Sequence, residues 1–125
     1  MTQPTYTVEL TNNIVVVKIS GDWNIQADLG YLTLLDETIS RVRNENWALF
    51  ADLRGWQVSE EVLNLKHNLT IKLARKNQQA ECWLVDNMDQ GIHIQHHIES
   101  QNVPLYKCLS RQDAEDWLMQ NGFYL

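Results

Sequence analysis

The feature that most constrains the fold of this chain is the alternation of short apolar runs with segments in which apolar residues recur every three or four positions. The runs NIVVVKISG, WALFADL, AECWLVD and VPLYKCL have the length and the β-branched and aromatic content of strands. The segments between them are amphipathic, as helices that cover a sheet are. Strands that alternate with helices lie parallel and are joined by right-handed crossovers, so the sequence predicts an α/β fold.

The first two predicted strands form an antiparallel hairpin. Apolar and polar side chains alternate over Thr5–Thr11, as in a half-buried strand at the edge of a sheet. Asn12 and Asn13 follow, and asparagine tolerates the positive φ of a tight two-residue turn. The next run has almost no polar face, which predicts a strand that is covered on both sides and ends at Gly21.

The remaining elements follow in alternation, and Asn24, Ser59 and Ser110 are suitable caps for helices. The expected helices are about Ile25–Arg43, Ser59–Asn77, a short segment within Gly91–Asn102, and a last helix that stops at Gly122. In the third of these, the spacing of Ile92 and Ile94 would also suit a strand. The expected strands are Trp47–Leu53, Ala80–Asp86 and Val103–Leu109, where Pro104 favours an edge. Residues 1–125 have the size of one domain, and we predict a single domain with a mostly parallel mixed sheet of about five strands and about four helices.

Composition argues against several classes of function. The longest uninterrupted apolar runs are four to five residues, far short of the roughly 20 that span a membrane, and the first ten residues resemble no export signal. We therefore expect a cytoplasmic protein without a membrane span. The formal net charge of -6 opposes binding to nucleic acids. Cys82 and Cys108 stand singly in apolar runs, which predicts reduced thiols in the core.

Basic residues concentrate in the predicted second helix. Lys66, Lys72, Arg75 and Lys76 follow one another with no acidic residue among them. One interpretation is a solvated helix whose last turn carries cations that suit the negative end of the helix dipole. The other is a contact with an anionic partner.

The order of elements and three motifs resemble the SpoIIAA-like superfamily, which includes the STAS domains of anti-anti-sigma factors. The motifs are IVVVKISGDW before the first helix, LFADLRGW before the second, and LSRQDAEDWL near the end. The closer resemblance is to a branch of small stand-alone bacterial proteins, also described as STAS/SEC14-like. The resemblance implies a non-catalytic regulatory module that binds a protein partner. The SEC14-like character implies an alternative, a carrier or sensor of a small apolar or lipid-like ligand.

The resemblance also bears on Ser59. In anti-anti-sigma STAS domains, a serine in an Asp-Ser-x-Gly-like motif is phosphorylated after a strand that ends in Asp-Leu. Asp52 and Leu53 match that strand end, but Glu60 and Glu61 occupy the positions of the Asp-Ser pair and no glycine follows. We therefore expect Ser59 to cap a helix rather than to act as a phosphorylated switch.

The candidate binding residues surround the end of the third predicted strand. Trp23 and Trp56 each follow a strand end and a turn that contains glycine, so both are expected on one rim of the sheet and partly exposed. There they would contact a partner or cover an apolar ligand. The alternative is two large residues that close the core. The candidate residues are Trp23, Asp52, Gly55, Trp56, Ser59, Glu60 and Glu61.

Two further groups have the residue types of chemical sites. Asp52 and Asp86 end strands and could hold Mg²⁺ or act as an acid and base pair, but no phosphate-binding or nucleophile motif accompanies them. His93, His96 and His97 have helical spacing, yet they lack the H-E-x-x-H arrangement. Turn-forming acids and solvated histidines are the simpler interpretations. We expect no enzyme activity, metal or cofactor; the expected partner is a protein, and a homodimer and a lipid-like ligand stay open.

Overall fold

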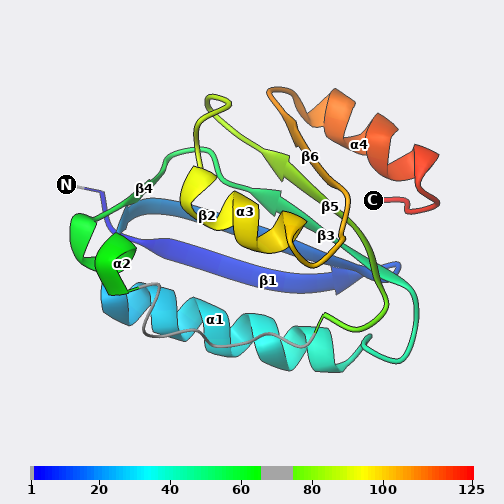
Figure 1. Ribbon diagram of the computed structural model, residues 1–125, viewed down its shortest axis with the longest axis horizontal. Coiled ribbons are helices and arrows are strands. Elements are labelled where there is room, and N and C mark those ends of the chain that lie inside the picture. The colour runs from blue at the N-terminus through cyan, green and yellow to red at the C-terminus, as the bar shows by residue number, and fades with distance from the viewer. Residues whose placement is uncertain (1, 66–74) are drawn as a thin grey trace.

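A computed structural model describes residues 2–65 and 75–125. Within these ranges the chain forms a six-stranded sheet and four helices (Figure 1). The strands are β1 (Thr5–Thr11), β2 (Ile14–Trp23), β3 (Trp47–Asp52), β4 (Trp56–Val58), β5 (Gln78–Leu84) and β6 (Leu105–Cys108). The helices are α1 (Ile25–Ser40), α2 (Glu60–Leu65), α3 (Ile92–Glu99) and α4 (Arg111–Gln120).

The sheet is mixed and mostly parallel, as predicted. Its order is β1-β2-β3-β5-β6, and the short strand β4 pairs with β2 outside this path. β1 is antiparallel to β2, whereas all other pairs of neighbours are parallel. The prediction of an N-terminal hairpin on an α/β sheet is therefore confirmed, and so are the edge positions of β1 and of β6, which follows Pro104.

The helices cover the two faces of the sheet unequally. Residues of α1, α2 and α3 share one core cluster, whereas residues of α4 and Phe123 share a second cluster on the opposite face. In Figure 1, α1 runs below the sheet and α4 lies above it at the right. We call these two sides the α1/α3 face and the α4 face.

Local chemistry explains the hairpin and the helix ends. Asn12 and Asn13 adopt φ of 50° and 62°, which the predicted two-residue turn requires. The side chains of Asn24 and Ser110 accept hydrogen bonds from backbone N–H groups in the first turns of α1 and α4. Gly122 has φ of 89° after the end of α4, so the predicted stop is confirmed.

The prediction that the second strand ends at Gly21 is wrong. β2 continues to Trp23 because its last residues pair with β4, in a register that places Gly21 opposite Trp56. The N–H of Gly21 donates to the carbonyl of Gly55 at 2.9 Å. Glycine is required there, since a β-carbon would lie 2.1 Å from the carbonyl oxygen of Gln3.

The predicted second helix is correct at its start and wrong at its end. α2 begins at Glu60, but Arg75–Asn77 form a turn into β5, in which Asn77 has φ of 68°. Residues 66–74, including Lys66 and Lys72, lie outside the described residues. Arg75 is not part of a solvated helix, because it forms an ion pair with the buried Glu81.

The other boundaries differ from the predictions by one to three residues. α1 ends at Ser40 rather than near Arg43 because residues 41–44 form turns. The segment Gly91–Asn102 contains a helix, α3, as expected. Cys82 and Cys108 are free and buried, which confirms the predicted core thiols. Within the described ranges, each helix is too short or too polar to span a bilayer.

Candidate functional site

The carboxyl ends of β3 and β5 are fixed by two aspartates. The Asp52 carboxylate accepts hydrogen bonds from the backbone N–H of Arg54 at 3.1 Å and from its guanidinium at 2.9 and 3.0 Å. The Asp86 carboxylate accepts a hydrogen bond from the backbone N–H of Gly55 at 2.6 Å. Both strand-end acids therefore hold the segment that follows β3, in agreement with their interpretation as turn-forming residues.

A glutamine that was not predicted from the sequence completes this arrangement. The side-chain amide of Gln90 donates to the carbonyls of Leu53 at 2.6 Å and Trp56 at 2.9 Å, while its oxygen accepts from the N–H of Asp86 at 2.8 Å. Gln90 lies in a polar connection between β5 and α3 that carries no motif, so no sequence signal pointed to it. We call Leu53–Val58, which these bonds hold, the rim loop.

The charge state of Asp52 follows from its contacts. Partial burial favours the neutral acid, but the hydrogen bonds and the positive charge of Arg54 outweigh it, so the pKa of Asp52 is lowered. Asp52 stays ionised at neutral pH and is engaged by a guanidinium. A carboxylate in this state is a structural anchor and a poor general base.

Trp23 and Trp56 lie together at this end of the sheet, but the expectation that they are partly exposed is wrong. Their exposed fractions are 1% and 6%, and their rings meet edge to face with centroids 6.3 Å apart. The pairing of β4 with β2 draws Trp56 onto the sheet. The two residues close the core of the α1/α3 face, which was the alternative interpretation.

The two indole N–H groups differ in their partners. Trp23 Nε1 donates to the Asp28 carboxylate at 3.3 Å. Trp56 Nε1 is buried and has no hydrogen-bond partner in the part of the chain that the structure describes. The ring of His93 from α3 packs against Trp56, with centroids 5.6 Å apart and a tilt of 37°. A buried donor without an acceptor is costly to the folded state.

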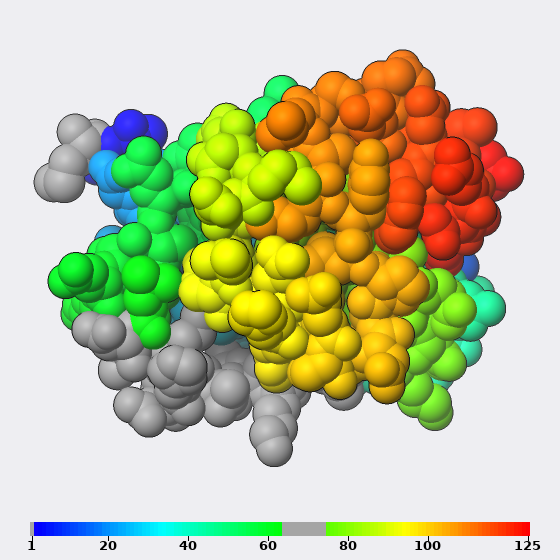
Figure 2. Space-filling view, turned by 45° about the horizontal axis from the view of Figure 1, so that its top comes forward, coloured from blue at the N-terminus to red at the C-terminus, as the bar shows by residue number. Residues whose placement is uncertain are grey.

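The start of α2 presents charged and apolar groups to solvent. Ser59 caps the helix as predicted, because its Oγ accepts a hydrogen bond from the N–H of Val62 at 3.3 Å. Glu60 and Glu61 are exposed, and Leu63 is 36% exposed. We call Glu60, Glu61 and Leu63 the α2 surface. Figure 2 shows α2 in bright green at the left, on the opposite side of the view from α4 in red and orange.

The predicted histidine group does not converge on one point. His93 is half-buried against Trp56, whereas His96 and His97 are exposed. The ring of His97 lies 3.0 Å from the side-chain amide of Gln101. Across residues 2–65 and 75–125, no group of three or more histidine, cysteine, aspartate or glutamate side chains is arranged to hold a metal ion.

A buried ion pair lies beneath the α1/α3 face. The Glu81 carboxylate, whose residue is 2% exposed, accepts hydrogen bonds from Arg75 at 2.6 Å, Gln78 at 2.8 Å and the indole of Trp83 at 2.7 Å. All three donors come from this chain, so the acid is satisfied and structural. A signal for it was present, since Glu81 is the one charged residue inside the run AECWLV.

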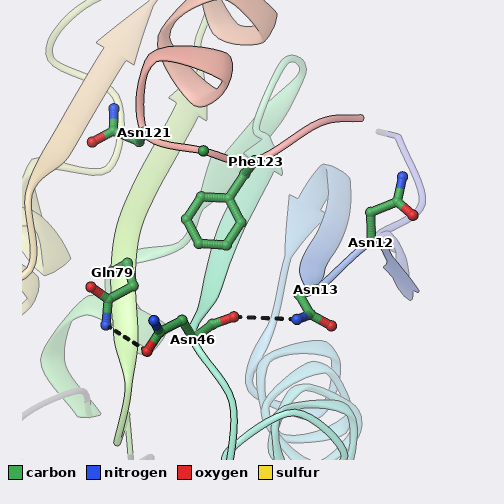
Figure 3. Close-up of a pocket in the computed structure, with 7 residues that line it drawn as sticks. Asn12, Asn13, Asn46, Gln79, Asn121 and Phe123 are labelled. Carbon is green, nitrogen blue, oxygen red and sulfur yellow. Dashed lines mark hydrogen bonds between the residues drawn. The ribbon is translucent and has the colours of Figure 1, made fainter.

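A hollow of about 400 Å³ lies at the opposite end of the sheet (Figure 3). Its lining residues carry mostly amide side chains, and none is charged: Asn12, Asn13, Asn46, Gln79, Asn121, Gly122 and Phe123. Several of these amides bond to one another or to backbone carbonyls of the lining, as between Gln79 and Asn46 at 3.3 Å. The hollow contains none of the predicted site residues.

Comparisons with known proteins bear on the fold. No family model matches the chain, and no curated protein matches its sequence. A DUF3478 family protein with a SpoIIAA-like fold from Shewanella loihica PV-4 is similar in structure, with a TM-score of 0.61, 13% identity, and coverage of 94% of this chain and 95% of the other. An anti-sigma factor antagonist from Mycobacterium paratuberculosis is similar with a TM-score of 0.51, 20% identity and the same coverage. The chain therefore has the SpoIIAA-like fold that its motifs and order of elements predicted.

Proposed function

We propose that this protein is a non-catalytic interaction module of STAS-like type that works in the cytoplasm and binds a protein partner through the rim loop and the α2 surface. The observation that carries the proposal is the contrast between two groups of side chains at this end of the sheet. Asp52, Asp86 and Gln90 are engaged in holding the rim loop, while Glu60, Glu61 and Leu63 on the adjoining helix are left to solvent. A fixed loop beside an exposed, mixed surface suits recognition rather than chemistry.

The chemistry of this end of the molecule supports a basic partner. Acidic groups are exposed on the α2 surface and, beyond β5, at Asp86 and Asp89. Apolar side chains are exposed on segments that leave the carboxyl ends of strands: Leu63, Met88, Ile92 and Leu109. A partner that places lysine or arginine around an apolar contact complements both features.

In our proposal, this module is not regulated through a phosphoserine, as anti-anti-sigma STAS domains are. The Ser59 Oγ caps α2, and Glu60 and Glu61 supply permanent negative charge at the helix start, where that charge is favourable. The surface is then constitutively charged. Its binding is set by the partner's availability rather than by modification of Ser59.

A charge-reversal experiment tests the proposal. The double variant Glu60→Lys/Glu61→Lys places two cations on the α2 surface without touching a buried side chain. Proteins captured from an extract of the host by wild type are identified, purified and titrated against both forms. We expect the variant to weaken the binding by at least about tenfold, because like charges then face the partner.

The control carries the same change of charge elsewhere. Glu37→Lys/Glu45→Lys reverses two exposed acids at the far end of α1 and in the turn before β3. This variant should bind the purified partner as wild type does. Equal binding by the α2 variant and wild type, or equal weakening by both variants, would refute the α2 surface as the contact.

Trp56 favours a second candidate function, the carrier of a small apolar or lipid-like ligand. Its buried N–H has no acceptor among the described residues, and aromatic rings surround it at Trp23 and His93. The carboxylate or carbonyl of an apolar ligand would supply that acceptor.

Tryptophan fluorescence titrated with oleate separates the two candidates. A carrier gives a saturable change in emission at a stoichiometry of one, and Trp56→Phe removes that change because the donor is gone. An emission spectrum that stays flat through the titration eliminates the carrier and leaves the interaction module.

A further inference from the structure

The outer edge of β1 is an open strand edge. Among the strands of residues 2–65 and 75–125, β1 is the first in the sheet order and pairs with β2 alone (Figure 1). Its seven residues, TYTVELT, pair with β2 in a continuous register from Thr5 opposite Ser20 to Thr11 opposite Ile14. A strand of this length with a free edge is a template for pairing with another strand.

The hairpin determines which backbone groups face outward. Thr11 and Ile14 flank the two-residue turn, so they form a hydrogen-bonded pair, and bonded pairs alternate from there along the strand. The odd-numbered residues of β1 therefore bond to β2. The N–H and C=O groups of Tyr6, Val8 and Leu10 point to the open edge, and none of these groups has a partner in the described part of the chain.

This edge lacks the usual protection against pairing. Natural edge strands carry proline, bulges, inward charges or several lysines. β1 has no proline and no bulge within Thr5–Thr11, and Glu9 is its one charged residue. Apart from Glu9, the side chains of β1 that lie on the α4 face are threonines, which favour strand pairing.

We propose that two copies of this chain pair through their β1 edges, antiparallel about a two-fold axis at Val8, and form one continuous sheet. In this register Val8 faces Val8 of the second copy, and each Tyr6 faces Leu10. All three outward-facing residues of each copy then exchange hydrogen bonds. Shifting the register by two residues in either direction leaves one of them without a partner.

Charge excludes one of the two shifted registers. With the axis at Val8, Glu9 of each copy faces Thr7 of the other, and Thr5 faces Thr11, so no like charges are directly opposed. A shift that moved the axis to Glu9 would oppose the two glutamates, which destabilises a strand pair. The self-complementary pattern of TYTVELT about its centre is what identifies the second copy as the occupant of this edge.

α1 lies on the same face of the sheet as the side chains of Tyr6, Val8 and Leu10. It packs over β1, where a β-carbon on Gly30 would lie 2.5 Å from the hydroxyl of Tyr6. An axis perpendicular to the sheet places both copies of α1 on one face of the joined sheet, on either side of the axis.

Single charges at Thr7 test the pairing and its register together. Thr7 faces Lys18 within its own chain, so Thr7→Glu gains a favourable neighbour in the monomer. In the dimer the carboxylate introduced by Thr7→Glu faces Glu9 of the second copy, and the two-fold axis produces this like-charge contact twice. Sedimentation equilibrium should show wild type with twice the mass of the 14.6 kDa chain, and Thr7→Glu with a dissociation constant raised about 2- to 30-fold.

Two further variants make the test specific. Thr7→Glu/Glu9→Lys places opposite charges face to face and should restore the wild-type dissociation constant. Asn44→Glu adds the same charge to an exposed turn and should leave it unchanged. A wild type that is monomeric at every accessible concentration would overturn the proposal. So would a dimer whose dissociation constant Thr7→Glu does not change, since it would form through another surface.

Discussion

The two faces of the sheet have different kinds of core. The α1/α3 face buries charged and hydrogen-bonding groups, among them Glu81, Arg75 and the indole N–H groups of Trp83 and Trp56. The α4 face is filled by apolar side chains of different sizes, including Ala48, Phe50, Cys82, Leu84 and Leu118. The first core is specified by directional bonds and the second by volume. The stability of variants should therefore depend on hydrogen-bond partners on the α1/α3 face and on side-chain volume on the α4 face.

The largest effect is expected from breaking the ion pair. Glu81→Leu removes the carboxylate that pairs with the buried guanidinium of Arg75, which then keeps only the neutral amide oxygen of Gln78 as an acceptor among the described residues, and it also removes the partner of Trp83. The loss should be about 3–5 kcal/mol of the free energy of unfolding, because an unpaired buried charge is strongly unfavourable. Urea denaturation followed by circular dichroism measures it.

A double variant sharpens this result. In Glu81→Leu/Arg75→Leu neither charge remains, so most of the lost stability should return. If the double variant is instead about as unstable as the sum of the two single variants, the ion pair is not the organising contact of this face.

The next effect compares two tryptophans on the same face. Trp83→Phe removes the donor to a buried carboxylate, whereas Trp56→Phe removes an N–H that has no partner among the described residues. Both lose the same volume, so the difference isolates the hydrogen bond. Trp83→Phe should cost about 1–3 kcal/mol more in unfolding free energy than Trp56→Phe. Equal midpoints in urea would contradict the distinction.

The α4 face should show size effects and little chemistry. Burial raises the pKa of the Cys82 and Cys108 thiols, so neither is a ready nucleophile. Cys82→Ala should cost about 1 kcal/mol, since it removes one sulfur from a packed site. In the folded protein both thiols should react with a disulfide reagent at pH 9 much more slowly than in urea. Rapid reaction of the folded form would show that this core is open.

The smallest effect concerns the rim loop and depends on pH. The pKa of Asp52 is lowered in the folded protein, so its contribution to stability is complete above the unfolded value of about 4 and is lost as the pH falls through the folded value. Asp52→Asn removes this dependence. Thermal unfolding midpoints between about pH 5 and 2 should fall less steeply for the variant than for wild type. Parallel curves would show that Asp52 does not hold the loop.

Features set by local chemistry were predictable from the sequence. Asn12 and Asn13 specify the hairpin turn, and Ser59 and Ser110 begin helices where they were expected. In each case one residue type satisfies a backbone requirement within a few positions along the chain. The order of these local signals was enough for the fold class.

Features set by tertiary contact were not predictable. β4 consists of three residues, and it exists because Trp56–Val58 pairs with the end of β2. That pairing extends β2 past Gly21 and buries Trp56. The missing β4, the wrong end of β2 and the wrong exposure of Trp56 therefore have one cause. Gln90 could not be found because its partners are backbone carbonyls 34 and 37 positions away. Glu81, by contrast, was detectable as a charge inside an apolar strand.

The central claim is that the rim loop and the α2 surface bind a protein. Native mass spectrometry of the untagged protein, isolated gently from its host, tests this most directly when it is repeated with Glu60→Lys/Glu61→Lys. The proposed function predicts a second polypeptide bound to wild type and absent from the variant. The same polypeptide bound equally to both, or a small molecule in its place, would contradict it.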